Sequence, residues 1–579
     1  MKRYLILLTL VSFFTGLAAQ NTNGKINTRY LRPSITMLFA EPKDADEAIL
    51  INKFRNLEVP GKFDDHRIQF PDMKPVENTN PAKKTLLENY IRKASNPVIA
   101  KWWGRDEQGN FNYTLVAKRA SYTATDADAI ISRGSNTSRI EMLGEQLIDR
   151  SYILLYEITD LYTMDEYYDR LDAQNRKKKD YTPAKRTEEG YNCDYKVYAY
   201  KVAFNDSVAA EFYNRYWVDA QNPDKQKAAA WADATFPVRL ITEAAGSVRS
   251  SQTKAKEKNK VKKTMQELLE DIPANIQSGA AFELGRKIED FKLKVTVFKA
   301  YPVTAKLGTK EDLYTDQRFY VYEIEQDRSG NQSTVRKGVV RAKTINDNKG
   351  IATGTSLPSA FQQVQGKRIY PGMFMESKDD YGIILNTGFV SSGNKAMGGF
   401  HIGADIRISR FIKKPGWHFG IDVAINPFKN VYAGDIETDT RTLISSADMC
   451  SGNTLALAVT GSKEMYFTRR GNIYLRPQVG LGIQTYSFSE VGSYSIASDD
   501  KDYSWTSYIL PAGIGLGYNI SPMLSLEMKP GVYLRTGAST DNKESLSQTA
   551  APTDDKWGFG TIGKFSTGTT NTFSLKIRF

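Results

Sequence analysis

NTFSLKIRF, residues 571–579 at the carboxyl end, decides the fold class. Successive side chains of an extended strand point to opposite faces, so this segment has two contrasting faces. One face is apolar and carries Phe573, Leu575, Ile577 and Phe579. The other face is polar and carries Ser574, Lys576 and Arg578. The chain is therefore predicted to end on a strand that is apolar on one side and charged on the other.

The same two-residue alternation recurs upstream, from Tyr381 onward. It predicts about eight strands of roughly the length that crosses a bilayer with tilt. Their expected ranges are 381–390, 400–408, 417–425, 455–467, 475–483, 508–518, 524–534 and 571–579. We therefore expect an antiparallel sheet that closes on itself, with the apolar face outside.

The connections between these strands alternate in length. The segments 411–415, 469–472 and 519–522 are short, whereas 429–453, 487–504 and 537–566 are long and polar. Short turns at one end and long loops at the other are typical of membrane barrels. The first outer connection, 391–395, is an exception because it is short. A soluble β-sandwich is the alternative that alternation alone leaves open.

Residues 1–20 are predicted to be a secretory signal peptide. Basic Lys2 and Arg3 precede an apolar run, and small residues follow it. Taken with this signal, residues 379–579 resemble the small eight-stranded outer-membrane barrels of Gram-negative bacteria, the OmpA-like and OmpX-like superfamily. The strand alternation, the loop asymmetry and Phe579 carry the resemblance. It implies the fold and the membrane but little about activity, because that superfamily includes anchors, adhesins, small pores and a few enzymes.

An eight-stranded barrel is only just wide enough for its own side chains. Charged residues that face its lumen must be paired or hydrated. The predicted lumen polar network is Asp405, Arg407, Asp422, Arg476, Glu527, Lys529, Arg535, Lys576 and Arg578. We expect it to form an ion-paired plug. Gly513, Gly515 and Gly517 are expected on the inward face of one strand, where they leave room for long charged neighbours.

The remainder is expected to be a periplasmic region of several parts. Residues 21–130 are predicted to be an irregular or α+β segment, 131–333 an α/β region, and 334–378 a small β-barrel module. An internal repeat is expected because 143–158 and 284–298 resemble each other, and each is followed by another strand. A helix after the lysine-rich run 254–263 is expected to stop at Pro273.

Motifs for chemistry are sparse. The three histidines, His66, His401 and His418, have no metal-ligand spacing in sequence. Cys193 and Cys450 are expected on opposite sides of the membrane, in the periplasmic part and in a long outer loop. We predict no catalytic, cofactor-binding or metal residues, and no cofactor. The net charge of +12 is spread along the chain, and nucleic acid is excluded because an exported protein does not meet it.

These observations predict a multidomain, non-enzymatic outer-membrane anchor or scaffold. Its barrel would contact outer-membrane lipid, its loops would face the exterior, and its periplasmic region would bind an envelope protein or glycan. A narrow pore or secretion accessory is one alternative, because inward basic residues outnumber acidic ones. A lipid- or peptide-modifying barrel enzyme is the second.

Overall fold

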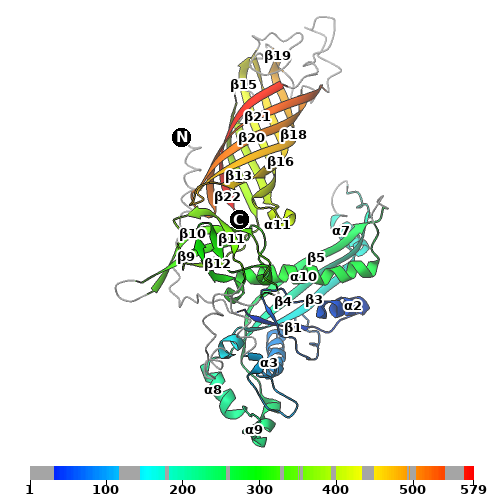
Figure 1. Ribbon diagram of the computed structural model, residues 1–579. Coiled ribbons are helices and arrows are strands. Elements are labelled where there is room, and N and C mark those ends of the chain that lie inside the picture. Colours follow the sequence, from blue (N-terminus) through cyan, green and yellow to red (C-terminus); the bar gives the residue numbers. More distant parts are fainter. Residues whose placement is uncertain are drawn as a thin grey trace.

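The computed structural model describes residues 32–77, 79–116, 144–176, 181–255, 261–326, 332–349, 351, 356–392, 399–432, 449–491, 494–495, 504–540 and 566–579. The predicted signal peptide lies outside them. The described strands form three sheets. Figure 1 shows the barrel at the top, a small second sheet directly below it, and an α/β unit at the bottom.

The α/β unit contains a five-stranded sheet of order β2-β1-β3-β4-β5. Strand β1 runs parallel to its neighbours β2 and β3, and the remaining pairs are antiparallel. The strands are β1 (Ser34–Phe39), β2 (Asp64–Asp65), β3 (Ser151–Thr163), β4 (Glu188–Val202) and β5 (Val238–Thr253).

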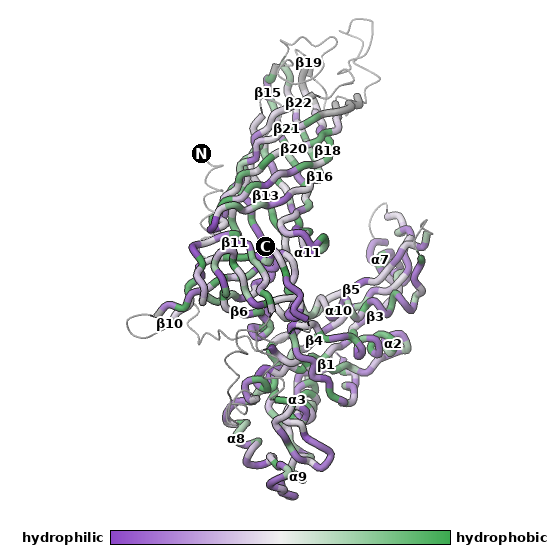
Figure 2. The backbone as a smooth tube through the Cα atoms, in the orientation of Figure 1, coloured by the Kyte–Doolittle hydropathy of each residue, from purple (hydrophilic) through white to green (hydrophobic). Residues whose placement is uncertain are grey.

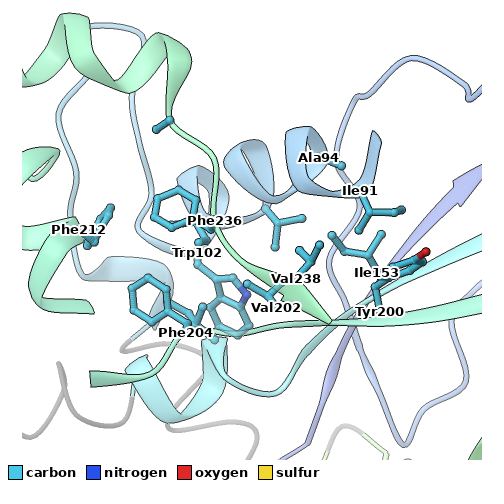
Figure 3. Packing of buried hydrophobic residues seen from close by; sticks show 14 of the residues in the cluster. Ile91, Ala94, Trp102, Ile153, Tyr200, Val202, Phe204, Phe212, Phe236 and Val238 are labelled. Atoms are coloured by element: carbon cyan, nitrogen blue, oxygen red, sulfur yellow. The ribbon is translucent and has the colours of Figure 1, made fainter. Parts of the chain in front are cut away.

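Helices cover both faces of this sheet. Strand β3 supplies Tyr152 and Leu154 to one core, together with α2 (Ala45–Arg55) and α10 (Met265–Lys287). The alternate residues Ile153 and Leu155 enter a second core with α3 (Lys83–Trp102). Burial on both faces explains why β3 is a nearly continuous apolar run. Figure 3 shows Trp102 of α3 packed among Phe204, Phe236 and Val238 in the second core. The unit also contains α7 (Met164–Asn175), α8 (Asp206–Arg215) and α9 (Lys225–Ala230).

Two expectations for this unit need correction. The proposed boundary between 21–130 and 131–333 does not hold, because β1 pairs with β3 across it. Pro273 does not end a helix but lies inside α10. The helix continues because Ile276, Ala280 and Leu284 are buried against the sheet, and this packing outweighs the one backbone hydrogen bond that proline removes.

The second sheet has the order β6-β12-β9-β10-β11-β8-β7. Its end strands, β6 and β7, follow each other in the chain, so the sheet curls round upon itself. Val297 N bonds to Met373 O beside β12, and Phe298 N bonds to Thr304 O beside β8. We call this closed unit, residues 294–377, the small barrel module. Its strands are β6 (Lys294–Thr296), β7 (Lys299–Ala300), β8 (Val303–Ala305), β9 (Arg318–Gln326), β10 (Gln332–Thr344), β11 (Ser359–Gly366) and β12 (Phe374–Ser377).

The module is larger than the one expected over 334–378. The boundary at 333/334 falls inside the hairpin of β9 and β10, which pair directly. The expected repeat is not reproduced in the strand pairing either. Strands β3 and β4 are direct neighbours, whereas β12 separates β6 from β9.

The last third forms the predicted eight-stranded antiparallel barrel. Strand β22 pairs with β21 on one side and with β13 on the other, which closes the sheet. Short strands β17 (Met465–Tyr466) and β19 (Tyr494–Ser495) pair with β18, and a four-residue helix, α11 (Ser409–Ile412), precedes β15. The barrel strands are β13 (Ile383–Ser392), β14 (Gly399–Arg407), β15 (Trp417–Tyr432), β16 (Met449–Lys463), β18 (Ile473–Val491), β20 (Ser504–Asn519), β21 (Leu524–Thr540) and β22 (Ser566–Arg578).

The outer surface of the barrel is apolar. Most of the large apolar side chains exposed among the described residues belong to it, for example Ile402 at 50%, Ile421 at 48% and Leu481 at 67%. Residues between them in sequence are mostly buried or half-buried, and Figure 2 shows hydrophobic and hydrophilic positions interspersed along the strands. Such a continuous exposed apolar band requires an apolar solvent. Within the described ranges, no helix is long and apolar enough to cross a membrane.

Several of the long strands extend further than the sequence pattern predicted, and β15 and β16 are two examples. Strand β15 reaches Tyr432 and β16 begins at Met449. Cys450, expected in an outer loop, therefore lies within β16, and only 1% of it is exposed.

Candidate functional site: the barrel interior and its junction with the module

The barrel has two unlike ends. Residues 408–416, 464–472 and 519–523 connect strands at the short-turn end, which faces the small barrel module (Figure 1). The interior holds charged and polar side chains in three layers between this end and the long connections.

The first layer, nearest the module, centres on Glu464. Its carboxylate accepts two hydrogen bonds from Arg578, at 3.1 and 2.8 Å, and one from the Tyr466 hydroxyl at 2.8 Å. Arg407 lies 4.0 Å away on the same carboxylate. A bidentate arginine with further donors compensates the burial of a carboxylate best.

The middle layer centres on Arg476, of which only 1% is exposed. Its guanidinium lies 2.7 Å from Asp405 and 4.0 Å from Glu527. Lys576 lies 2.6 Å from the same Glu527. Two cations thus face two carboxylates, which leaves the layer close to neutral.

The third layer lies towards the long connections. Asp422 accepts a hydrogen bond from Gln478 at 2.6 Å and lies 3.2 Å from His401 Nε2 and 3.8 Å from Lys529. These groups border a cavity of about 30 Å³, a space for water and not for a lipid or peptide substrate. His401 is thus a lumen histidine hydrogen-bonded to a carboxylate.

The glycines of β20 make room for this network. A Cβ on Gly515 would lie 2.8 Å from Glu527, and one on Gly517 would overlap the ring of Tyr474. A Cβ on Gly513 would come within 3.1 Å of Lys529. The three glycines therefore permit the long side chains of the facing strands to enter the lumen.

The structure brings the predicted lumen residues together in these layers, except that the side chain of Arg535 lies outside the described part. Glu464 was missed, because it lies between β16 and β17, where the strand alternation is interrupted. His418 is fully buried at the short-turn end.

The small barrel module contacts the short-turn end directly. Asp316 of the module accepts hydrogen bonds from Gly416 N at 2.7 Å and from Arg407 at 3.3 Å. Asn519 of the barrel donates to Val364 O at 2.7 Å, and Asn472 accepts from Gly366 N at 2.7 Å. The module therefore occupies the short-turn end of the barrel.

Asp380, on the link between module and barrel, forms a second junction. It is paired with Arg341 and lies 3.4 Å from Arg318. Burial alone raises the pKa of this carboxyl, but the two guanidinium groups outweigh burial and hold the pKa well below its ordinary value. Asp380 therefore remains ionised throughout the physiological range.

The terminal strand has the two faces that the sequence indicated. Phe573 and Phe579 are exposed on the outer surface, at 50% and 40%, and Leu575 and Ile577 are half-buried between them. Phe579 N donates to Ile383 O of the first strand at 2.9 Å. This hydrogen bond of Phe579 extends the pairing between β22 and β13, which closes the barrel.

Charged clusters of the α/β unit have structural partners. Lys254, Lys262 and Lys263 of the lysine-rich run pair with Asp165, Glu189 and Asp271.

His66 stacks on Trp102 in the core. Burial raises the pKa of the Cys193 thiol to about 12, so it is a poor nucleophile. Among the described residues, no three His, Cys, Asp or Glu side chains gather as a metal site would require.

Strand pairing, an apolar exterior and a polar interior define this region as a small eight-stranded membrane barrel. Neisserial surface protein A has a similar structure, with 12% identity and a TM-score of 0.21 over 35% of this chain and 100% of that chain. The attachment invasion locus protein Ail of Yersinia pestis matches with 13% identity and a TM-score of 0.19, over 34% of this chain and 95% of that one. A major outer membrane protein from Thermus thermophilus matches with 14% identity and a TM-score of 0.22, over 34% and 98%.

These likenesses concern the fold and carry nothing about function. No family model matches the chain, and no curated protein matches it.

Proposed function

We propose that this chain is a non-enzymatic outer-membrane anchor. Its barrel holds the region from 21 to 378 in the periplasm, where that region binds another component of the envelope, and its long connections face the exterior. The partner is an envelope protein or glycan.

One observation carries the proposal. Charged and polar side chains fill the interior of the barrel, and the small barrel module covers its short-turn end. Its charges are compensated in three layers, and the module bonds to its short-turn end through Asp316, Asn472 and Asn519. A pore needs a continuous water path, which this filling opposes. An anchor needs only an apolar outer surface on the barrel and a fixed attachment between the barrel and the region that it holds.

The attachment continues into the α/β unit. Lys62 N donates to Asp312 of the module at 3.1 Å, and Arg32 lies 3.9 Å from Glu311. Bonds at both junctions favour a periplasmic region that is held at a fixed place below the membrane, as a scaffold requires.

Single-channel recording on the purified full chain in planar bilayers separates an anchor from the narrow-pore alternative. We expect no steady conductance after the protein has inserted, because paired side chains fill the lumen. Steady conductance, above all with anion preference, would contradict the anchor.

Orientation can be tested in cells with single cysteines in a background without Cys193 and Cys450. Lys84→Cys on α3 and Lys429→Cys near the long-connection end of β15 both replace exposed side chains. An impermeant maleimide is expected to label position 429 in intact cells and position 84 only after the outer membrane is permeabilised. The reverse result would contradict the proposed topology.

A further inference from the structure

The short-turn end of the barrel carries exposed basic side chains with no exposed acidic counterpart. We call Arg410, Lys413, Lys414, Arg469 and Arg470 the basic rim; all five are exposed. The one acidic residue in these connections, Glu464, is buried against Arg578. The exposed charge within these three connections is therefore uniformly positive.

Two members of the basic rim are fixed in place by the module. The guanidinium of Arg410 lies 4.5 Å from the ring centroid of Tyr314, and that of Arg469 lies 5.0 Å from the ring centroid of Tyr301. Lys413, Lys414 and Arg470 form no ion pair with any described residue. Within the described part of the chain, these three charges are therefore not neutralised by an ion pair.

Large apolar side chains lie in the same connections. Phe411, next in sequence to Arg410, is 80% exposed, and Phe467 is 56% exposed. Ile520 and Met523, in the third connection, are 47% and 46% exposed. They continue the apolar surface of the barrel to its edge, so the basic rim lies where that surface ends.

Basic and aromatic side chains side by side suit the boundary between lipid tails and headgroups. Aromatic rings concentrate at this level, and Lys and Arg extend their charged ends towards the phosphates while their stems stay apolar. A protein partner would need a surface complementary in shape to the exposed Phe411 ring, whereas a lipid leaflet solvates the ring without any complementary shape.

We propose that the basic rim binds the headgroups of anionic phospholipids in the leaflet at the short-turn end. This inference rests on the proposed membrane placement of the barrel and adds a lipid preference to it. The binding is electrostatic, so it favours anionic over zwitterionic headgroups and weakens with salt.

The test uses bromine as a contact quencher of an introduced indole. The full chain with Phe411→Trp is reconstituted into vesicles of phosphatidylethanolamine and phosphatidylglycerol, with bromine on the chains of one lipid or the other at equal amounts. Fluorescence is compared with that of the unsubstituted chain, which already has seven tryptophans. We expect quenching by brominated phosphatidylglycerol to be about twofold stronger than by brominated phosphatidylethanolamine at low salt.

Matched variants separate charge from apolar insertion. In the Phe411→Trp background, Lys413→Gln/Lys414→Gln/Arg470→Gln is expected to make the two lipids quench equally. The control Lys84→Gln/Lys93→Gln/Lys225→Gln removes three exposed lysines of the α/β unit, and it should leave the preference intact.

A second reporter, Ile402→Trp, sits on the outer face of β14, where Ile402 is 50% exposed. Quenching at position 402 by both lipids establishes that the barrel is embedded. If position 402 is quenched and position 411 is not, or if position 411 is quenched equally by both lipids, the anionic-lipid proposal is overturned. If position 402 is not quenched, the membrane placement itself fails.

Discussion

At the scale of residues, the barrel interior depends on buried charges that have their partners. Removing one partner leaves the other charge buried without compensation, which typically costs about 3–5 kcal/mol. An exposed ion pair contributes far less, because water and salt screen it. Buried and exposed arginines of this chain should therefore respond very differently to the same substitution.

Arg476→Ala tests this difference. It leaves Asp405 and Glu527 short of a counter-charge in the middle layer, and we expect a loss of about 3–5 kcal/mol in the free energy of unfolding. Arg215→Ala on α8 is the control, because its pair with Glu211 has side chains 63% and 59% exposed. It should cost less than about 1 kcal/mol. Guanidinium unfolding in detergent micelles measures both, and similar small losses would contradict the ion-paired lumen.

Asp380 gives a prediction about pH. Because its pKa is lowered in the folded protein, its ion pairs contribute stability that is fully present above the ordinary Asp pKa of about 3.9 and is lost as pH falls through the lower native value. The stability difference between the unsubstituted chain and Asp380→Asn should stay constant from about pH 8 to about pH 5 and shrink only below about pH 4. Urea midpoints of the full chain across this range measure it. A difference that has vanished by about pH 6 would show that the pKa is not lowered.

At the scale of elements, strands with one face in lipid could be predicted well. Their period-two alternation is visible locally, so the faces of β14, β15 and β22 follow from the sequence alone. The parallel pairing of β1 with β3 could not be predicted, because more than a hundred residues separate the partners and no turn marks their meeting. The role of Glu464 could not be predicted for a related reason. Glu464 lies where the strand is interrupted between β16 and β17, and its partner Arg578 lies in the last strand of the barrel, far along the sequence.

The glycines of β20 permit an element-scale prediction. Gly517→Ala places a methyl group against the Tyr474 ring, and we expect a loss of about 1–3 kcal/mol in unfolding free energy. Gly461→Ala in β16 is the matched control, since nothing lies within 4 Å of its added Cβ. Thermal unfolding compares the two variants. Samples are heated to a series of temperatures and loaded on a gel without boiling, and the loss of the compact folded band is followed. Equal effects would mean that β20 does not need its glycines for the facing side chains.

At the scale of the whole molecule, three units follow one another from the α/β unit through the small barrel module to the membrane barrel. The order of these parts could be predicted, but their boundaries could not. The sequence pattern places residues 294–333 in the α/β region because Leu293–Phe298 and Phe319–Ile324 resemble the two strands of a second repeat copy. Only the pairing of β6 with β12 and of β7 with β8 shows that the module closes before the barrel begins.

Lipid tails are expected to solvate the outer surface of the last two hundred or so residues. The most direct measurement is fractionation of cells that make the full chain, with alkaline carbonate extraction of the membranes. We expect the chain to remain in the membrane pellet and to be released only by detergent. A monodisperse chain in the soluble fraction, stable in buffer without detergent, would contradict the account.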